Sequence, residues 1–370
     1  MKNIVVFLLV LLIAVNCTEA EDTGEKVVLI VLDGAGMMDL DLGVRGECEA
    51  VFPTLTRPNH ASIITGVYPN RHGVLGNEYW ENGVKKYTRI DAVTLFEILK
   101  DHGKESVVIA KDNICKLFGA YCETIVEEDP ETVFKTIEKE LREKDFVFVN
   151  IAILDHLGHK YGPNSDEVES ARDELKDLFS EYPIDAVTIV TADHGMGEIS
   201  KAVEITKYLQ DYTSIALSEG RVCYIYNRDD EDIDFQMEGV EKVIEKRDFP
   251  EYHIDHANSP DMILTAKEGY AFLPGPLLAT YKGMHGSLQE KTVVVTTNYK
   301  KEGTIECKMV DIAPWILEIF GISGDYEFDG EVPEIVEREP QHAPIIPYVL
   351  LGMALIGLIA VLVRRRSPHG

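Results

Sequence analysis

Residues 52–80 read FPTLTRPNHASIITGVYPNRHGVLGNEYW, and the rest of the chain is organised around this stretch. It places a hydroxyl group, that of Thr56, two residues before Pro58. Proline is tolerated in the first turn of a helix, where its missing N–H group would lack a partner, so a helix is predicted to begin here. A helix start presents unpaired backbone donors and a dipole that favours anions. Thr56 is therefore either an ordinary N-cap or a nucleophile placed to attack a phosphoryl group.

The chain is strongly acidic, with 36 Lys and Arg against 64 Asp and Glu among 370 residues and a formal net charge of −28. This length suffices for one large domain or two medium ones with a sizeable core. An acidic chain without a basic stripe repels polyanions, so no nucleic-acid polymer is expected as a partner. A small phosphoester held by metal ions remains compatible with this charge.

Both ends of the chain are hydrophobic. Residues 1–20 combine Lys2, an apolar run and the small residues Thr18 and Ala20, a pattern typical of a signal peptide. Residues 345–363 carry no charge and precede three arginines, which predicts a transmembrane helix followed by a cytoplasmic basic tail, 364–370. Residues 324–344 are acidic and contain proline, as in a stalk. We therefore expect a membrane-anchored protein whose catalytic domain, residues 25–323, lies outside the cytoplasm.

Five cysteines remain after cleavage at Ala20, so at least one is unpaired or bridges another molecule. Cys115 and Cys122 are close enough in sequence for a short-loop disulfide in an oxidising compartment. Cys17 is a second possible processing site, as a lipoprotein cysteine. There is no CxxC pair in the sequence, and we predict no thiolate metal site.

Apolar runs alternate with amphipathic segments along the body. Continuous apolar runs are typical of parallel strands buried on both faces, and the intervening segments have helical periodicity. The alternation predicts an α/β fold, a three-layer α/β/α sandwich with a mostly parallel central sheet. The predicted strands are 27–32, 106–110, 146–154, 186–190, 221–226, 261–266 and 292–297, and the predicted helices are 91–100, 131–142, 165–179, 237–246 and 311–320.

Carboxylates and imidazoles follow these predicted strands. Ligands of open α/β sheets bind beyond the carboxyl ends of the strands, so side chains placed there converge on one crevice. A mixed Asp and His ligand set is typical of Zn²⁺, with Mn²⁺ or Fe²⁺ as alternatives. The candidate metal ligands are Asp33, Asp155, Asp193, His159, His194 and His285.

Five motifs carry a resemblance that extends from about residue 27 to residue 322: VVLIVLDG, PTLTRPNHASIITGVYPNRHG, LDHLGHKYGP, VTADHGM and GMHG. With them the chain resembles the alkaline phosphatase superfamily, most closely its nucleotide pyrophosphatase/phosphodiesterase branch. The resemblance implies a two-metal hydrolase that cleaves phosphodiester or pyrophosphate bonds through a covalent phosphothreonine. It assigns one metal to Asp33, Asp193, His194 and Thr56, the other to Asp155, His159 and His285, and a phosphoryl-oxygen contact to Asn77.

The motifs also depart from that family's pattern. Arg57 stands where nucleotide-cleaving members commonly have an aromatic residue that stacks on the base, and its guanidinium can stack or bind a second anionic group. Lys111 resembles a phosphate-contacting lysine of threonine-type alkaline phosphatases, although Asn113 replaces their arginine. Tyr79 and Trp80 either line a leaving-group pocket or belong to the core.

We therefore predict a phosphodiesterase or nucleotide pyrophosphatase acting on small phosphoesters. A phosphomonoesterase on the same metals is one alternative. A transferase that moves a phosphoryl head group from lipid to glycan is another, and a catalytically inactive binding protein is a third. The sequence indicates no oligomeric state. His60, His72 and His156 have no predicted ligand role and are interpreted as structural or surface residues.

Overall fold

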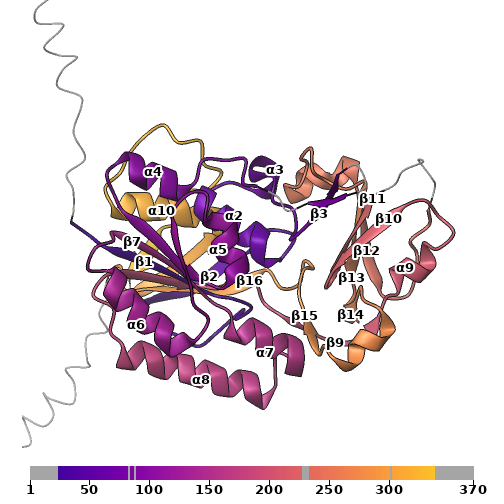
Figure 1. Ribbon diagram of the computed structural model, residues 1–370, viewed down its shortest axis with the longest axis horizontal. Helices are drawn as coiled ribbons and strands as arrows, with labels where there is room; N and C mark the ends of the chain where they lie inside the picture. Colours follow the sequence, from indigo (N-terminus) through magenta and orange to yellow (C-terminus); the bar gives the residue numbers. More distant parts are fainter. Residues whose placement is uncertain (1–23, 82–83, 87–88, 227–232, 301, 338–370) are drawn as a thin grey trace, which may run out of the picture. The chain divides into compact units, whose positions relative to one another are not determined.

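A sheet built around β1 (Val27–Leu32) forms the centre of the molecule (Figure 1). In this computed structural model, which describes residues 24–81, 84–86, 89–226, 233–300 and 302–337, every residue of β1 is buried. β1 pairs in parallel with β7 (Phe146–Ile151) on one side and β8 (Val187–Thr191) on the other. A strand covered on both faces must be apolar throughout, which is why its sequence predicts it so clearly.

In the described part of the chain, the strands of the central sheet lie in the order β18-β17-β2-β16-β8-β1-β7-β5-β6. The strands from β8 to β6 are parallel, whereas β16 runs antiparallel to both its neighbours. The prediction of a mostly parallel central sheet is confirmed. The remaining strands of this sheet are β2 (Val44–Glu49), β5 (Ser106–Ala110), β6 (Glu123–Val126), β16 (Thr292–Thr297), β17 (Gly303–Lys308) and β18 (Ile335–Glu337).

Helices cover both faces of this sheet, as the three-layer prediction requires. Figure 1 shows α2, α4, α5 and α10 on one side and α6, α7 and α8 on the other. Their apolar faces, such as Val133, Phe134 and Ile137 of α6, are buried against the strands. The helices are α2 (Thr56–Thr65), α3 (Pro69–His72), α4 (Leu95–Asp101), α5 (Asp112–Phe118), α6 (Pro130–Glu140), α7 (Ile153–Tyr161), α8 (Asp166–Glu181) and α10 (Ile312–Ile319).

Smaller sheets are inserted between β8 and β16. One has the order β10-β11-β13-β12, another the order β14-β9-β15, and β3 (Tyr79–Glu81) pairs with β4 (Val84–Lys86) earlier in the chain. The inserted elements are β9 (Gly197–Ala202), α9 (Ile205–Tyr208), β10 (Ile215–Glu219), β11 (Val222–Tyr226), β12 (Val240–Glu245), η1 (Lys246–Tyr252), β13 (Met262–Ala266), β14 (Gly269–Ala271), η2 (Gly275–Ala279) and β15 (Gly283–Met284).

The helix predicted over 237–246 is wrong, because β12 occupies this segment and pairs antiparallel with β13. Val240 and Ile244 are buried, and their spacing of four suits either a helix or one face of a strand. Pairing with β13, where Ile244 lies opposite Ile263, decides for the strand. Local periodicity alone does not separate these two structures.

The strand predicted over 146–154 ends earlier, at Ile151, and α7 begins at Ile153. Asp155 therefore lies in the first turn of a helix rather than at the end of a strand. The helix predicted from residue 91 begins instead at Leu95, because Thr94 and Glu97 form a capping box.

Within the described residues a disulfide joins Cys48 and Cys307, whereas Cys115 and Cys122 are free thiols. The short-loop pairing considered from the sequence is therefore wrong. Cys48 and Cys307 are partners in the parallel register of β2 and β17, although 259 positions separate them along the chain. Only the strand order brings them together.

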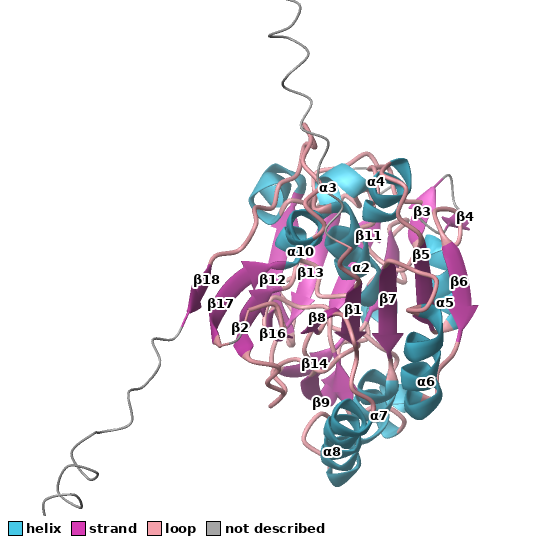
Figure 2. Cartoon of the chain, turned by 90° about the vertical axis from the view of Figure 1, so that its left-hand side faces the viewer, coloured by secondary structure: helices cyan, strands magenta, loops and turns pink. Residues whose placement is uncertain are grey.

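The segment after α10 lies against the body. Asp329 accepts hydrogen bonds from the Tyr68 N–H group and the Arg71 guanidinium, and β18 continues the sheet at its edge (Figure 2). The stalk boundary expected at residue 324 thus falls inside the compact unit, which extends to Val336. None of the helices in the described ranges is long and apolar enough to cross a membrane. The predicted signal peptide and the apolar segment 345–363 lie outside these ranges.

Candidate active site

The first group of candidate ligands lies at the carboxyl ends of β1 and β8. Asp33 directly follows β1, and Asp193 and His194 follow β8 after Ala192. All three side chains are fully buried, and their ligand atoms lie within 4.8 Å of one another. The Asp33 and Asp193 carboxylates lie 3.5 and 3.4 Å from His194 Nε2. Adjacent parallel strands explain this meeting, since their carboxyl ends share one edge of the sheet.

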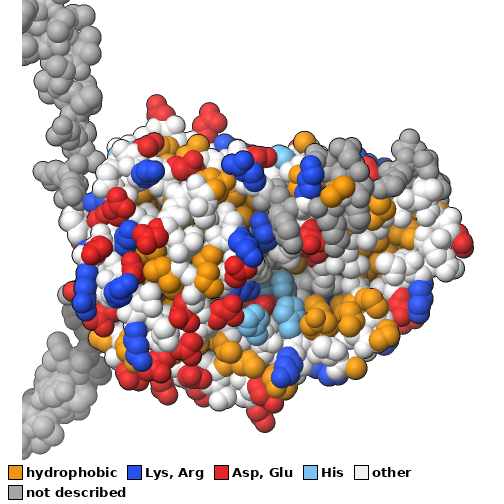
Figure 3. Space-filling model, viewed as in Figure 1, with side chains coloured by type: hydrophobic (Ala, Val, Ile, Leu, Met, Phe, Trp, Pro, Cys, Tyr) orange, Lys and Arg blue, Asp and Glu red, His pale blue; other side chains and the backbone are white. Residues whose placement is uncertain are grey.

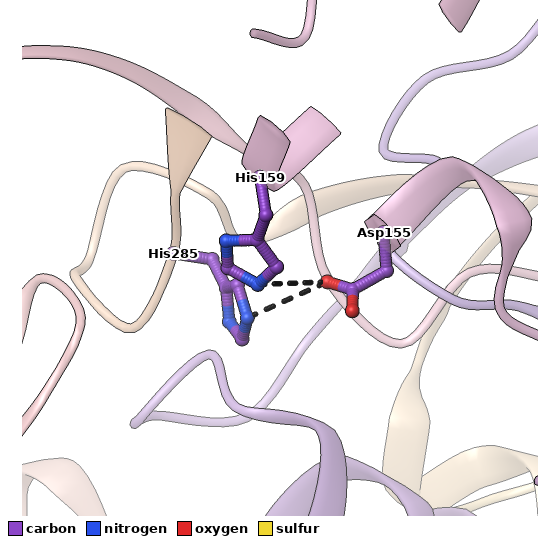
Figure 4. Close-up of side chains that lie close together, drawn as sticks. All are labelled: Asp155, His159 and His285. Carbon is purple, nitrogen blue, oxygen red and sulfur yellow. Dashed lines mark ion pairs between the residues drawn. The ribbon is translucent and has the colours of Figure 1, made fainter. Parts of the chain in front are cut away.

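The second group contains Asp155, His159 and His285 (Figure 4). Asp155 and His159 are one turn apart on α7, so they project from the same face of that helix. His285 comes from the loop after β15, and the Nε2 atoms of His159 and His285 lie 3.2 and 3.6 Å from Asp155 Oδ1. The two groups are adjacent, because the rings of His194 and His285 stack with centroids 3.7 Å apart. Figure 3 shows histidine side chains together in a hollow of the surface.

The three histidines share one tautomer. A carbonyl oxygen can only accept, so an Nδ1 atom bound to a carbonyl carries the hydrogen, and Nε2 of the neutral ring keeps a lone pair. In every case Nε2 faces carboxylate oxygens. Facing lone pairs repel unless a cation lies between them. The three bonds, each 2.9 Å long, run from His159 Nδ1 to the Gly283 carbonyl, from His194 Nδ1 to that of Gly195, and from His285 Nδ1 to that of Thr54.

The ring pKa values follow from burial and from the facing carboxylates. Burial lowers the pKa of His194 and of His285, which keeps both rings neutral near pH 7. Burial also opposes protonation of His159, but the hydrogen bond with Asp155, the charge of that carboxylate and smaller contributions from Gly283 and Asp33 together outweigh burial and raise the pKa of His159. A histidine binds metal only as the neutral ring, so His194 and His285 are already in the binding state, whereas a metal ion would compete with a proton for Nε2 of His159.

The negative charges of the buried carboxylates are only partly compensated by hydrogen bonds and cations. Within the described residues, the buried atoms Asp33 Oδ1 and Asp193 Oδ2 accept no hydrogen bond. Burial, reinforced by the charge of Asp33, raises the pKa of Asp193 well above its ordinary value. Buried charges need opposite charge or hydrogen bonds. The ligand types, the lone pairs and the unsatisfied oxygens all fit a divalent metal ion at each group.

Thr56 is the first residue of α2, and Leu55 occupies the N-cap position. The Thr56 hydroxyl makes no capping hydrogen bond; instead its Oγ1 lies 3.2 Å from His194 Nε2. The helix predicted to begin at Thr56 is therefore confirmed, but the N-cap interpretation is wrong. The hydroxyl lies at the positive end of a helix dipole, beside the first ligand group.

Lys111 lies between the two groups. It is the N-cap residue of α5, and its Nζ atom is 2.6 Å from Asp33 Oδ2 and 3.9 Å from Asp155 Oδ2. Burial opposes its charge, but Asp33 and Asp155 raise the pKa of Lys111, so it stays cationic. The same ammonium lowers the pKa of Asp33 although burial acts in the opposite direction. Lys111 thus contacts one carboxylate of each group.

The other predicted site residues are less closely tied to these groups. Arg57 is buried beside Thr56 on α2, with 8% of its surface exposed. Asn77 and Tyr79 are half-buried, and hydrogen bonds among the described residues connect neither side chain to the six ligands. Trp80 is in β3, and its side chain lies outside the described part of the chain.

From the sequence, Glu219 and Asn150 are not identified as neighbours of the site, and His60 is interpreted only as a structural or surface residue. Glu219, at the end of β10, accepts hydrogen bonds from the backbone N–H groups of Asn77 and Glu78. His60 and Asn150 are buried beneath Thr56 and Asp33. The sequence does indicate Asn150, because it is the one amide side chain in the otherwise apolar strand FVFVNI. The residues around Glu219 give no comparable indication of its role.

His72 is fully buried, whereas His156 is exposed. Both lie outside the two ligand groups, in agreement with their interpretation as structural and surface residues.

Comparisons with known proteins agree with this architecture. Human ectonucleotide pyrophosphatase/phosphodiesterase family member 1 is 26% identical over 239 residues, which are 55% of this chain and 26% of that protein. The chain spans about a quarter of the length of the curated relatives it matches.

Two solved structures share the fold. Murine ectonucleotide pyrophosphatase/phosphodiesterase 5, an inactive threonine-to-alanine variant in complex with AMP, has a TM-score of 0.68 at 17% identity, covering 81% of this chain and 96% of that one. Phosphonoacetate hydrolase from Sinorhizobium meliloti, in complex with phosphonoformate, has a TM-score of 0.64 at 19% identity, covering 78% and 94%.

The sequence model of one family matches residues 36–96 and 120–288, more than half of the chain and the region that carries Thr56, Asp155 and both residues of the Asp193–His194 pair. The chain therefore belongs to the type I phosphodiesterase/nucleotide pyrophosphatase family, within the alkaline phosphatase superfamily.

Proposed function

We propose that this protein is a metal-dependent hydrolase that cleaves phosphodiester or pyrophosphate bonds of nucleotides or related small phosphoesters, with Thr56 as nucleophile. The observation that carries the proposal is the Thr56 hydroxyl at the start of α2, 3.2 Å from Nε2 of His194 in the first group, whose ring stacks on His285 of the second group. The murine relative with bound AMP, whose threonine-to-alanine variant is inactive, supports both the nucleotide and the threonine.

The first metal would be held by Asp33, Asp193, His194 and Thr56, and the second by Asp155, His159 and His285. We propose Zn²⁺, with Mn²⁺ or Fe²⁺ as alternatives. When bound, a pair of divalent ions supplies Lewis acidity that favours the ionised nucleophile and stabilises charge on the leaving group. The backbone carbonyls of Thr54, Gly195 and Gly283 hold the three rings in orientation.

In the proposed reaction, Thr56 carries out the first step. Its oxygen loses the hydroxyl proton to water and attacks phosphorus, so that an O–P bond to Thr56 forms while the bond to the leaving oxygen breaks. A water oxygen then attacks the phosphothreonine, releases the phosphate product and returns the hydroxyl. The positive end of α2 stabilises the phosphoryl charge. Asn77 donates to a non-bridging oxygen, and Arg57 and Tyr79 contact the remainder of the substrate.

A phosphomonoesterase is a second candidate because of Lys111. A monoester carries one more negative oxygen than a diester, and a fixed cation close to both ligand groups favours that extra charge. Replacing Lys111 by Met should therefore lower monoester turnover more than diester turnover. Equal losses on both substrates would contradict a role specific to monoesters.

A substrate panel tests the proposed function. Purified protein loaded with Zn²⁺ is assayed with bis-p-nitrophenyl phosphate, p-nitrophenyl phosphate and the p-nitrophenyl ester of a nucleotide. We expect the nucleotide ester and the diester to be hydrolysed faster than the monoester. No turnover of any substrate with Zn²⁺, Mn²⁺ or Fe²⁺ would overturn the proposal in favour of a transferase or a binding protein.

We also propose that residues 25–323 act outside the cytoplasm, after a cleaved segment 1–20 and before an anchor at 345–363. The Cys48–Cys307 disulfide supports an oxidising compartment. Protease added to intact cells should degrade the body, whereas a cytoplasmic control protein should survive. Digestion only after lysis would contradict this location.

A further inference from the structure

His60 lies one helical turn after the nucleophile candidate on α2, and its ring reaches beneath the first ligand group. Its Nδ1 atom is 2.8 Å from the Thr56 carbonyl oxygen and 3.5 Å from Asp193 Oδ2. The ring is fully buried, and the aromatic rings of Phe118 and Phe148 lie 6.4 and 5.7 Å away between centroids. In such an apolar surrounding, each polar contact of His60 is costly to lose.

The hydrogen positions of this network follow from its partners. The Thr56 carbonyl can only accept, so Nδ1 of His60 carries the hydrogen. Asn150 Nδ2 lies 3.2 Å from Nε2 of His60 and also donates to Asp33 Oδ2. An amide NH₂ group can only donate, so Nε2 of His60 is the acceptor in this contact.

Asn150 completes the path to the metal ligand. Its Nδ2 atom also lies 3.2 Å from Asp33 Oδ2, so its two hydrogens serve His60 and Asp33. Asn150 is only 1% exposed and lies in β7. Its partner in the neighbouring strand β1 is Val31, which precedes Asp33 by two residues. A continuous chain of hydrogen bonds therefore runs from the backbone of the nucleophile candidate to a candidate metal ligand.

We propose that His60 and Asn150 are positioning residues, which hold the Thr56 backbone and the Asp33 carboxylate in the arrangement that binds metal and reacts. This inference rests on the proposed function. Asn150 orients Asp33 by donating to one of its oxygens, and residues that orient a metal ligand contribute to metal affinity. His60 connects the same amide to Thr56, so that the nucleophile and the ligand keep a common position.

Two variants separate the ends of this network. Asn150→Leu has a similar volume but removes both donors. His60→Gln keeps an acceptor near the position of Nε2 for Asn150 but loses the contact with the Thr56 carbonyl. His72→Gln is the matched control, because His72 is an equally buried histidine that contacts α2 through Ser62, 2.9 Å away, at the other end of the helix.

The experiment measures Zn²⁺ binding to metal-free protein in competition with a chromophoric chelator, together with kcat, KM and thermal unfolding without metal. We expect Asn150→Leu to weaken one of two Zn²⁺ sites by about 10- to 100-fold. His60→Gln should bind Zn²⁺ nearly as the wild type does but show a lower kcat at similar KM. His72→Gln should lose thermal stability without a change in Zn²⁺ affinity or kcat.

The outcomes are distinguishable. Wild-type protein that binds none of Zn²⁺, Mn²⁺ and Fe²⁺ would overturn the proposed function and this inference with it. Normal Zn²⁺ affinity and kcat in both variants would overturn the inference alone, as would losses that merely follow thermal stability in the same proportion as in His72→Gln. If Asn150→Leu does not fold, Asn150→Ser removes the amide with less apolar bulk and is judged by the same readouts.

Discussion

The contacts of Thr56 decide between two roles for a threonine at the start of a helix, an N-cap and a nucleophile. As an N-cap its hydroxyl would accept from a backbone N–H group two or three residues later. It makes no such bond, and Leu55 occupies the N-cap position. The hydroxyl is instead directed to His194, in a position 7% exposed. Thr56 is therefore not a helix cap, and its position beside His194 is the one that the proposed nucleophile requires.

Thr56→Ala should abolish most activity while the fold persists, because the change removes the nucleophile but little volume. We expect turnover of a diester to fall by about a thousandfold or more, since water must replace a positioned hydroxyl. Thr56→Ser keeps the hydroxyl and should retain measurable activity. Steady-state kinetics and Zn²⁺ content are measured for both variants. Wild-type turnover by Thr56→Ala would remove Thr56 from the mechanism.

His72 illustrates a buried histidine outside the site. Its Nδ1 atom accepts from the Val74 N–H group at 3.1 Å, so a neutral ring donates from Nε2 to Ser62. Burial lowers the pKa of His72 to about 3, against about 6.5 in an unfolded chain. Between these values the unfolded chain binds a proton that the folded chain does not. Its contribution to the free energy of unfolding therefore decreases as the pH falls below about 6.5.

His72→Asn should flatten this pH dependence. The asparagine oxygen can replace Nδ1 as acceptor for Val74, although the bond to Ser62 is lost and stability at pH 7.5 should decrease by about 1 kcal/mol. Between pH 7.5 and 4.5 the wild type should lose about 2–3 kcal/mol more than the variant. Urea unfolding at both pH values measures the difference. Parallel losses in the two proteins would show that His72 does not titrate in this range.

Among the secondary-structure elements, the turn between β10 and β11 connects the inserted sheet to the site. The Arg221 N–H group donates to the His285 carbonyl, and the Arg221 guanidinium forms a buried ion pair with Glu290. Glu290 in turn accepts from the backbone and hydroxyl of Ser287, whose carbonyl accepts from the Thr54 hydroxyl. One buried ion pair thus supports the loop that carries a candidate ligand.

Glu290→Gln should be strongly destabilising, because it leaves the guanidinium of Arg221, 1% exposed, without its counter-charge. We expect a loss of about 3–5 kcal/mol in the free energy of unfolding, measured with urea. Asp39→Asn is the control, since the Arg45–Asp39 pair is largely exposed and such pairs contribute little. A loss as small as that of the control would indicate that the pair does not support the loop.

The whole molecule combines a net charge of −28 with a cluster of buried carboxylates beyond the carboxyl ends of its parallel strands. Lys111 compensates part of this charge, but Asp33 Oδ1 and Asp193 Oδ2 still lack hydrogen bonds within the described residues. Metal ions bound at the two proposed sites of the folded chain would therefore add to its stability.

Metal removal should lower both activity and stability. Protein prepared without chelator is expected to contain about two equivalents of transition metal. At a free metal concentration 100 times Kd, each site contributes about 2.7 kcal/mol, so chelation should lower the Tm by several degrees. Elemental analysis and calorimetry before and after dialysis against EDTA measure both. Active enzyme without metal would contradict the mechanism.

The sequence alone determined the central architecture and the candidate ligands. Burial on both faces forces a parallel strand to be apolar, so β1 and β5 are visible in the sequence as apolar runs. The ligands could be named because Asp and His recur in motifs beside those runs, where a sheet presents its ligands. The predictions erred where local patterns are ambiguous, as in β12, or where a helix follows a strand without a break, as before Asp155.

The tertiary structure decided everything that depends on contacts between distant segments. It brought the two groups of candidate ligands side by side, put Lys111 between them and connected His60 to Asn150. It also paired Cys48 with Cys307 across 259 positions. Such contacts arise from strand order and register, which long-range packing selects, and no local periodicity or spacing records them.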